Sequence, residues 1–587
     1  MMSGYNLKNT DMNINMKLFT MAFCILLMVA GCQKPYEFVS QRNGNGINSI
    51  TASFPGEDSA DNSFKGEIDT QNHVITMVFP YNWPVLSDDL LSEEKLQRVR
   101  MNANLENNVI IEPALLFMDL TKDNTITVID NSARTRTEYR IVAEIRKSAE
   151  CSLTQFNISS LGLSGVLNDK DMTISLISPD AIGTQTLTSD DIILSHGAVI
   201  SPDPRVVALD YDVDQKVTVT AQNGIDKKEY TVIKAIPAKV GLGMRGGSGT
   251  QLWVKSLKEL SGITDPKMVC GIAVTEDHIV INERGSKSLV YLNNKTGAPV
   301  GTVDVSAIVD SDKDNFHITA DEDGNILVTN LCGTNGGDGT KNLVIWKIAG
   351  VNAAPVKFIE YTLPATGTTY RCGWEISVQG SIGSNALITS QYCDGKSASF
   401  ARWQVVNGVL KSQAPDIIAT TLTAVNWANS TWGADIVYTS STDPDSDYFV
   451  ASHVYDTDNT RYLFWFKGNQ VLARGPGEAS KTIMNAVDYK EFNGGKYLLY
   501  NYVNTFTYAV TPSDAVNLYD VSGGNISTKI KVCDTKIHGS LGSGNGQVTT
   551  AASDVALKVS KNGYYMYAYF VFVNGNVGCV QYDCIDM

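Results

Sequence analysis

The second half of this chain repeats one strand-rich pattern, and that repeat restricts the possible folds most. An apolar segment, an acidic or glycine-containing turn and a second apolar segment recur six times. The copies are GIAVTEDHIVI from Gly271, HITADEDGNILVT from His317, WEISVQGSIGSNALIT from Trp374, GADIVYTSSTDPDSDYFVAS from Gly433, NAVDYKEFNGGKYLLY from Asn485 and AASDVALKVSKNGYYMYAYF from Ala551. A third apolar segment follows most copies, as in LVYLN, LVIWK, ARWQVV and YLFWFK. A period of about 50 residues with four strands per unit is typical of a β-propeller. We therefore expect an all-β protein with a six-bladed β-propeller over residues 251–587.

The strand count of this repeat also predicts how the ring closes. The last copy has room for only three strands before Met587, while an unassigned strand, Gln251–Leu257, precedes the first copy. Pairing the two in one blade would complete the sixth blade and remove an open sheet edge. A row of unrelated β-sandwiches is the alternative, but it explains neither the extra strand nor the sixfold recurrence.

A different repeat fills the first half of the chain. Asn107–Ile145 and His196–Ile236 share the order I-x-P, apolar segment, acidic turn, alternating T-V segment, polar turn and E-Y-x-(I/V)-(V/I). Alternation with period two marks half-buried strands, and short strands in units of about 95 residues suit immunoglobulin-like sandwiches. We expect two such domains over 47–147 and 148–237, followed by a glycine-rich linker over 238–250.

The N-terminus has the pattern of a bacterial lipoprotein signal. Lys17 precedes an apolar run, Leu18–Ala30, that is too short to span a bilayer and ends in Val29-Ala30-Gly31-Cys32. Residues 1–32 are therefore expected to be a signal peptide with a lipobox, Met16 the true start, Cys32 the acylated residue and 33–46 a polar tether. An ordinary signal peptide with a chance cysteine is the alternative.

Composition limits the possible partners and redox chemistry. The net charge of −15 argues against nucleic acid and against docking on anionic lipid headgroups, so we expect membrane contact only through the lipid anchor. Of ten cysteines, eight remain once Cys24 and Cys32 are set aside. The oxidising envelope permits disulfides, with Cys372–Cys393 as a candidate pair, and buried free thiols are the alternative.

Lipobox, tandem repeats and propeller together resemble envelope lipoproteins of Bacteroides-type bacteria, several of whose families are known only as domains of unknown function. The succession LWVKSLKEL, GIAVTEDHIVINERG and LVYLNNKTG, from Leu252, carries the resemblance at residue level. It implies a lipid-anchored protein, expected at the outer membrane, that binds a glycan within a polysaccharide-uptake system. Gln33-Lys34-Pro35-Tyr36 lacks the acidic stretch common after the cysteine in surface-exported members, so the cell surface and the periplasmic face both stay open.

Residues that precede the inner strands surround one mouth of a propeller channel, where ligands often bind. That register brings Tyr370, Arg371, Trp432 and His317 together, with Trp374 and Trp427 nearby in sequence. Aromatic rings can stack on the C–H faces of sugars while polar groups bind the hydroxyls. We therefore predict a glycan-binding mouth built from these six residues; packing of the tryptophans between blades is the alternative.

Enzymatic function is an open alternative, and the sequence favours a non-catalytic protein. The inner strands carry Asp321, Glu375, Asp435, Asp488 and Asp554, and a glycosidase needs two suitably spaced carboxylates. A polysaccharide hydrolase or lyase is therefore one alternative, and a protein-docking scaffold of an envelope complex is another. Because no G-x-S-x-G, H-E-x-x-H or P-loop motif occurs, no catalytic residue is assigned.

Two aspartate-rich runs are the only hint of a cofactor. Asp310, Asp312 and Asp314 alternate in the first run, and Asp443, Asp445 and Asp447 alternate in the second. Alternate carboxylates can bind calcium, but both runs lack the glycine and distal glutamate of a helix-loop-helix calcium site. Solvated acidic turns are the default interpretation, so no metal or cofactor is assigned, with calcium as the alternative.

Overall fold

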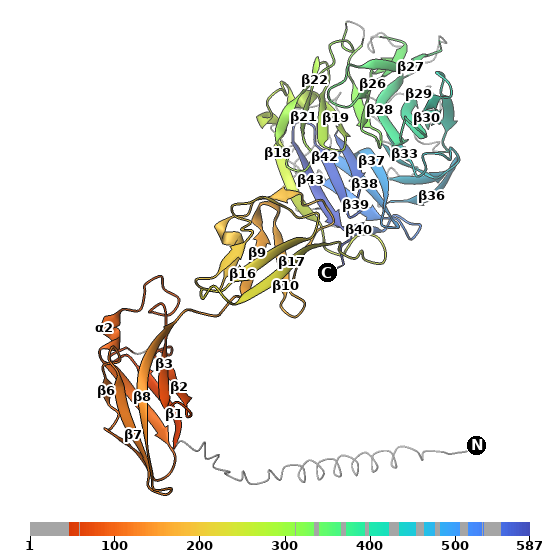
Figure 1. The fold of residues 1–587 in the computed structure, drawn as a ribbon. Coiled ribbons are helices and arrows are strands. Elements are labelled where there is room, and N and C mark those ends of the chain that lie inside the picture. The colour runs from red at the N-terminus through yellow and green to blue at the C-terminus, as the bar shows by residue number, and fades with distance from the viewer. Residues whose placement is uncertain are drawn as a thin grey trace, which may run out of the picture. The chain divides into compact units, whose positions relative to one another are not determined.

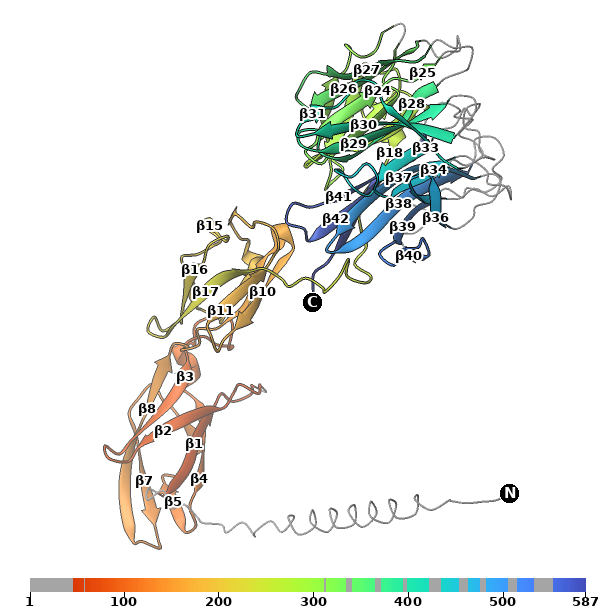
Figure 2. The same ribbon diagram turned by 90° about the vertical axis from the view of Figure 1, so that its right-hand side faces the viewer.

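A computed structural model describes residues 46–57, 59–310, 313–333, 340–364, 371–393, 398–421, 434–452, 463–475, 482–504, 515–530, 532 and 553–586. The chain divides into two compact units, Met1–Leu176 with Ile182–Lys234 and Ile177–Ala181 with Ala235–Met587. Sheets dominate both units (Figures 1 and 2). Within these described ranges, no helix has the length and apolar character that crossing a bilayer requires.

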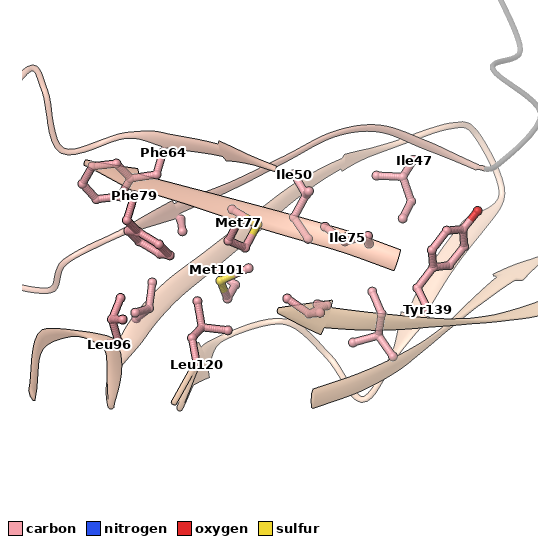
Figure 3. Packing of buried hydrophobic residues seen from close by; sticks show 14 of the residues in the cluster. Ile47, Ile50, Phe64, Ile75, Met77, Phe79, Leu96, Met101, Leu120 and Tyr139 are labelled. Carbon is pink, nitrogen blue, oxygen red and sulfur yellow. The ribbon is translucent and has the colours of Figure 1, made fainter. Parts of the chain in front are cut away.

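The first N-terminal region forms a sheet in the order β5-β7-β8-β3-β2-β1-β4-β6, in which β3 and β8 pair in parallel. Period-two patterns such as Val74–Pro80 bury alternate residues. These residues build a core that includes Phe64, Phe79, Met77 and Tyr139 (Figure 3). The elements are β1 (Ile47–Ser53), β2 (Phe64–Asp69), β3 (Val74–Pro80), α2 (Glu93–Leu96), β4 (Val99–Leu105), β5 (Val109–Glu112), β6 (Phe117–Met118), β7 (Asn124–Asp130) and β8 (Thr135–Arg146).

The second N-terminal region has its own sheet, in the order β13-β9-β10-β11-β17-β16-β14, and its own hydrophobic core around Phe156, Tyr211 and Tyr230. The all-β prediction is confirmed for both regions, whereas their immunoglobulin-like architecture stays a prediction. The elements are β9 (Leu153–Ile158), η1 (Ser159–Leu161), β10 (Leu163–Asn168), β11 (Thr173–Ile177), β12 (Thr184–Gln185), η2 (Ser189–Asp191), β13 (Ile192–Leu194), β14 (Val199–Ser201), β15 (Leu209–Asp210), β16 (Gln215–Thr220) and β17 (Lys227–Ala235).

The C-terminal region is a six-bladed β-propeller, as predicted from the repeat. The first three blades are β19 (Val269–Val274), β20 (His278–Glu283), β21 (Ser288–Asn293) and β22 (Pro299–Asp304); β23 (His317–Ala320), β24 (Asn325–Thr329), β26 (Asn342–Ala349) and β27 (Val356–Thr362); and β28 (Arg371–Gly380), β29 (Ala386–Cys393) and β30 (Ala398–Val406). Short strands extend the third blade: β25 (Cys332–Gly333) pairs with β28, and β31 (Val409–Leu410) and β32 (Asp416–Ala419) pair with β30.

Three further blades complete the propeller. They are β33 (Ala434–Tyr438), β34 (Tyr448–Ser452), β35 (Phe464–Lys467) and β36 (Gln470–Arg474); β37 (Thr482–Phe492), β38 (Gly495–Asn504), β39 (Ala515–Asp520) and β40 (Thr528–Ile530); and β41 (Asp554–Val559), β42 (Tyr565–Val571), β43 (Asn576–Asp583) and β18 (Thr250–Ser256). Two short turns, η3 (Leu257–Glu259) and η4 (Pro266–Met268), connect β18 to β19.

Ring closure follows the predicted strand exchange. β18 pairs antiparallel with β43 over Thr250–Ser256, so the first strand of the propeller completes its last blade (Figure 1). Buried side chains from neighbouring blades also form shared clusters; one of them joins Trp253 and Tyr569 of the last blade to Ile272 of the first. Each inner strand contacts the next one around the ring, in the order β19, β23, β28, β33, β37 and β41. The ring closes because β41 contacts β19. These strands line the channel where the candidate site lies.

The disulfide proposed between Cys372 and Cys393 is not formed. Cys372 and Cys393 are both buried free thiols, and the cross-strand partner of Cys372 in the sheet is Tyr392 on β29 and Cys332 on β25. Cys393 pairs instead with Arg371. Every cysteine that the structure describes is a buried free thiol, as expected for small apolar side chains in a packed core.

Candidate functional site

Inner-strand carboxyls join neighbouring blades around the channel. Three aspartates each accept a backbone N–H from the inner strand of the next blade. The bonds run to Asp435 Oδ2 from Val487 (2.8 Å), to Asp488 Oδ2 from Leu557 (2.7 Å) and to Asp554 Oδ2 from Ile272 (2.8 Å). An unpaired buried N–H would destabilise the fold by about 1–3 kcal/mol. These carboxyls, which the sequence offered as possible catalytic acids, therefore stabilise the ring.

His317 extends this arrangement with an imidazole ring. Its Nδ1 accepts the backbone N–H of Ile376 at 3.3 Å, which places the proton of the neutral ring on Nε2. Nε2 lies 2.6 Å from Glu375 Oε2 and 3.7 Å from Asp554 Oδ2, although its N–H is not aligned with an acceptor. Residues from the second, third and sixth blades thus form one buried cluster.

Gly271 of the first blade makes room for that cluster. Its φ of +116° is a conformation that side-chain-bearing residues rarely adopt. A Cβ atom at this position would lie 3.1 Å from both Cδ2 and Nε2 of His317. The missing side chain therefore lets His317 reach Asp554 across the first blade.

Burial controls the protonation of the channel carboxyls. It raises the pKa of Glu375 well above its usual range and also raises the pKa values of Asp435 and Asp488. Burial raises the pKa of Asp554 to about 8, although the nearby His317 opposes the shift. Burial also lowers the pKa of His317. Burial therefore favours the protonated form of each of these carboxyls and the neutral form of the imidazole.

The channel itself is narrow. Side chains from all six inner strands, among them Asp435, Asp488 and Asp554, line a cavity of about 50 Å³. A water molecule needs roughly 10–15 Å³ of such space, whereas ligand pockets measure about 300–1,000 Å³. The channel thus has room for a few water molecules and is too small for a sugar ring.

A much larger cavity, of about 510 Å³, opens where the inner strands reach their carboxyl ends. We call it the mouth cavity. Its lining is mostly polar, with hydroxyl, amide, carboxylate and ammonium groups contributed by five blades. The lining residues are Glu322, Gln379, Thr439, Ser440, Ser441, Tyr489, Lys490, Glu491, Lys558 and Val559.

Two lysines meet between the mouth cavity and the channel, since both residues line both spaces. Lys490 Nζ lies 3.2 Å from Glu322 Oε1, and Lys558 Nζ donates to the backbone carbonyl of Glu322 at 3.1 Å. Burial lowers the pKa of Lys558, and the charge of Lys490 acts in the same direction.

Of the residues predicted to bind ligand, the described ones lie near the starts of β23 and β28, at the opposite end of the inner strands from the mouth cavity. Tyr370, Trp427 and Trp432 lie outside the described residues, so their role stays a prediction. Arg371 is the first residue of β28 and is half-buried. Trp374 is 8% exposed and its ring packs against Phe316, 5.1 Å between centroids.

Among the predicted site residues that the structure describes, His317 is the one that belongs to the buried cluster of the inner strands, 2% exposed and next to Glu375. The prediction did not include Glu322, Lys490 and Lys558. The sequence held one signal for the two lysines. Residues separated by two or four positions on a strand lie on the same face, and Lys490 follows Asp488 by two residues while Lys558 follows Asp554 by four.

Described aspartates of the two aspartate-rich runs contact side chains and backbone groups of the protein. Asp314 forms an ion pair with Arg284 Nε at 2.6 Å, and Asp310 accepts the backbone N–H of Lys313. Asp447 accepts the indole N–H of Trp465 at 3.1 Å. Asp312 lies outside the described residues. Among the residues that are described, no group of three or more His, Cys, Asp or Glu side chains is arranged to hold a metal ion.

Comparison with protein families assigns the propeller region to a family. Residues 252–583 match the family described as Domain of unknown function (DUF8500). The chain belongs to this family. Residues 27–143 match a second family, Domain of unknown function (DUF5018), and residues 153–234 match a third, Domain of unknown function (DUF8499). No curated protein matches the chain.

Solved structures of Bacteroides proteins show some similarity to this DUF8500 chain. A DUF4623 family protein from Bacteroides eggerthii is 15% identical with a TM-score of 0.41, over 75% of this chain and 99% of that one. A protein of unknown function from Bacteroides caccae is 12% identical with a TM-score of 0.28, over 50% of this chain and 82% of that one. With TM-scores this low, the propeller assignment rests on strand pairing.

Proposed function

We propose that this protein is a non-catalytic lipoprotein of the bacterial envelope, anchored through Cys32 at the outer membrane, whose propeller binds a glycan. The observation that carries the proposal is the polar mouth cavity of about 510 Å³. Its volume falls within the range of small-molecule sites, about 300–1,000 Å³. Such a glycan-binding protein would act within a polysaccharide-uptake system.

The chemistry of the lining suits a sugar. A saccharide presents several hydroxyls that each donate and accept hydrogen bonds, and the hydroxyls of Thr439, Ser440 and Ser441 can do the same. Gln379 lines the same cavity, and its Oε1 is buried without a hydrogen-bond donor among the described residues. A hydroxyl of a bound sugar could supply the missing donor, which would favour binding because an unsatisfied buried acceptor destabilises the protein.

Binding without catalysis fits the state of the carboxyls. Glycoside hydrolysis needs an acid and a second carboxylate on either side of the scissile bond, about 5–9.5 Å apart. Asp435, Asp488 and Asp554 instead accept backbone N–H groups inside a cavity of about 50 Å³. In the mouth cavity, Glu322 pairs with Lys490 and Glu491 accepts the hydroxyl of Tyr489.

A glycan array probed with the soluble chain that starts after Cys32 tests this proposal. Gln379→Met keeps the side-chain volume but removes the amide, so it should weaken binding to any retained glycan by about tenfold, the effect of roughly one hydrogen bond. Gln470→Met, at an exposed position of the outer strand β36, is the matched control and should bind normally. A chain that retains no glycan, or a Gln379→Met variant that binds like wild type, would contradict the proposal.

A further inference from the structure

The two lysines beside Glu322 suggest what kind of glycan fits. Both ammonium groups contact the same residue, one at its carboxylate (3.2 Å) and one at its backbone carbonyl (3.1 Å). Both side chains also line the mouth cavity. Two cations therefore converge on one part of its wall.

These lysines differ in how their charge is balanced. Lys490 has the carboxylate of Glu322 as an ion-pair partner, and its side chain is 17% exposed. Lys558 donates to a neutral carbonyl, and no described carboxylate lies within ion-pair distance of its Nζ. The charges of Glu276, Glu322 and Asp321 favour its protonated form but none of them pairs with it directly, so the anionic group of a ligand would give this partly buried cation a direct partner. The lowered pKa of Lys558 reflects the same burial.

We infer that the mouth cavity binds an acidic glycan, whose anionic group lies between Lys490 and Lys558. This inference rests on the proposed glycan-binding function and specifies its ligand. The ammonium of lysine is a point charge that accepts a carboxylate or a sulfate equally well, so the shared feature is one negative charge.

The surrounding acids restrict the ligand to a single charge. Glu322 and Glu491 line the mouth cavity, and Asp321 lines the channel directly beneath it. They would repel a phosphate monoester, which carries about −1.5 to −2 charges at pH 7. A uronic acid or a sulfate ester satisfies Lys558 with less repulsion.

Affinity gel electrophoresis with four polymers tests the inference. The probes are polygalacturonate, its fully methyl-esterified form, dextran sulfate and dextran. We expect retardation by polygalacturonate or dextran sulfate and at least tenfold weaker retardation by the matched neutral polymer. Comparing each acidic polymer with its neutral counterpart shows whether a carboxylate or a sulfate supplies the negative charge that the lysines bind.

Lysine variants then test where the anionic group of the ligand binds. Lys558→Met should weaken binding of the acidic polymer at least tenfold, and Lys490→Met should weaken it too. Lys561→Met is the control, because Lys561 has an 81% exposed side chain outside the mouth cavity. Equal affinity for the charged and neutral forms, an unchanged Lys558→Met variant, or no retardation by either acidic polymer would overturn the inference. Retention of neutral glycans on the array would then show that glycan binding itself survives.

Discussion

Asp554→Asn should remove part of the pH dependence of propeller stability. Asp554 is buried at the channel, and burial raises its pKa from 3.8 to about 8. Asparagine is nearly isosteric with a protonated aspartate and does not titrate. One of the two backbone N–H bonds, from Ile272 or Val555, can still be accepted by the amide oxygen.

The sign follows from proton binding. Between the pKa of an unfolded aspartate and that of Asp554, the folded chain holds one more proton than the unfolded chain. The free energy of unfolding then decreases as pH rises, by about 1.4 kcal/mol per pH unit for each such proton. The stability that Asp554 contributes is complete below about pH 4 and is lost as pH rises through about 8.

From about pH 6 to about pH 8 this residue alone should lower the free energy of unfolding by at most about 3 kcal/mol. Glu375, Asp435 and Asp488 shift in the same direction and add to the decrease. His317 acts the other way, because its lowered pKa makes the folded chain bind fewer protons below the usual histidine pKa.

Urea unfolding at several pH values, followed by tryptophan fluorescence, measures this slope. Asp554→Asn should flatten the wild-type decrease by about one proton, and Asp277→Asn, at an exposed turn position, should leave it unchanged. The reasoning fails if wild-type stability is the same at about pH 6 and about pH 8, or if the variant keeps the wild-type slope.

Four further predictions concern the anchor, the ring and the ligand. Cys32→Ala should move the protein from the membrane fraction to the soluble fraction; membrane retention of the variant together with an unacylated wild type would contradict the lipoprotein signal. Deleting residues 250–256 should lower the melting temperature of the propeller well beyond the effect of trimming 238–248, because it exposes the edge of β43. Gly271→Ala should destabilise the propeller by about 1–3 kcal/mol in urea unfolding, and more than Gly285→Ala, whose added Cβ has open space; equal effects would argue against the contact with His317. Trp432→Ala compares the two ends of the inner strands: glycan binding in the mouth cavity should leave its affinity in titration calorimetry unchanged, and a loss of about 2 kcal/mol would instead favour the predicted site that precedes the inner strands.

The sequence by itself determined the strands, the blades and the closure. Alternation with period two depends only on which residues face a core, and the recurrence of that pattern gave six blades without knowledge of their contacts. The unassigned strand before Gly271 had a place only in the incomplete last blade, since an open edge is unfavourable. The structure bears this out with the pairing of β18 and β43.

Only the tertiary structure decided which polar residues meet. Lys490 and Lys558 are 168 and 236 residues from Glu322 in the chain, yet both contact it. Their meeting depends on how far each inner strand is shifted along the channel relative to its neighbours, and local patterns do not encode that shift. The same shift brings His317 to Glu375, with Gly271 leaving the space between. Sequence patterns record burial one strand at a time, whereas a site at the axis of a ring is set by the packing of all the blades together.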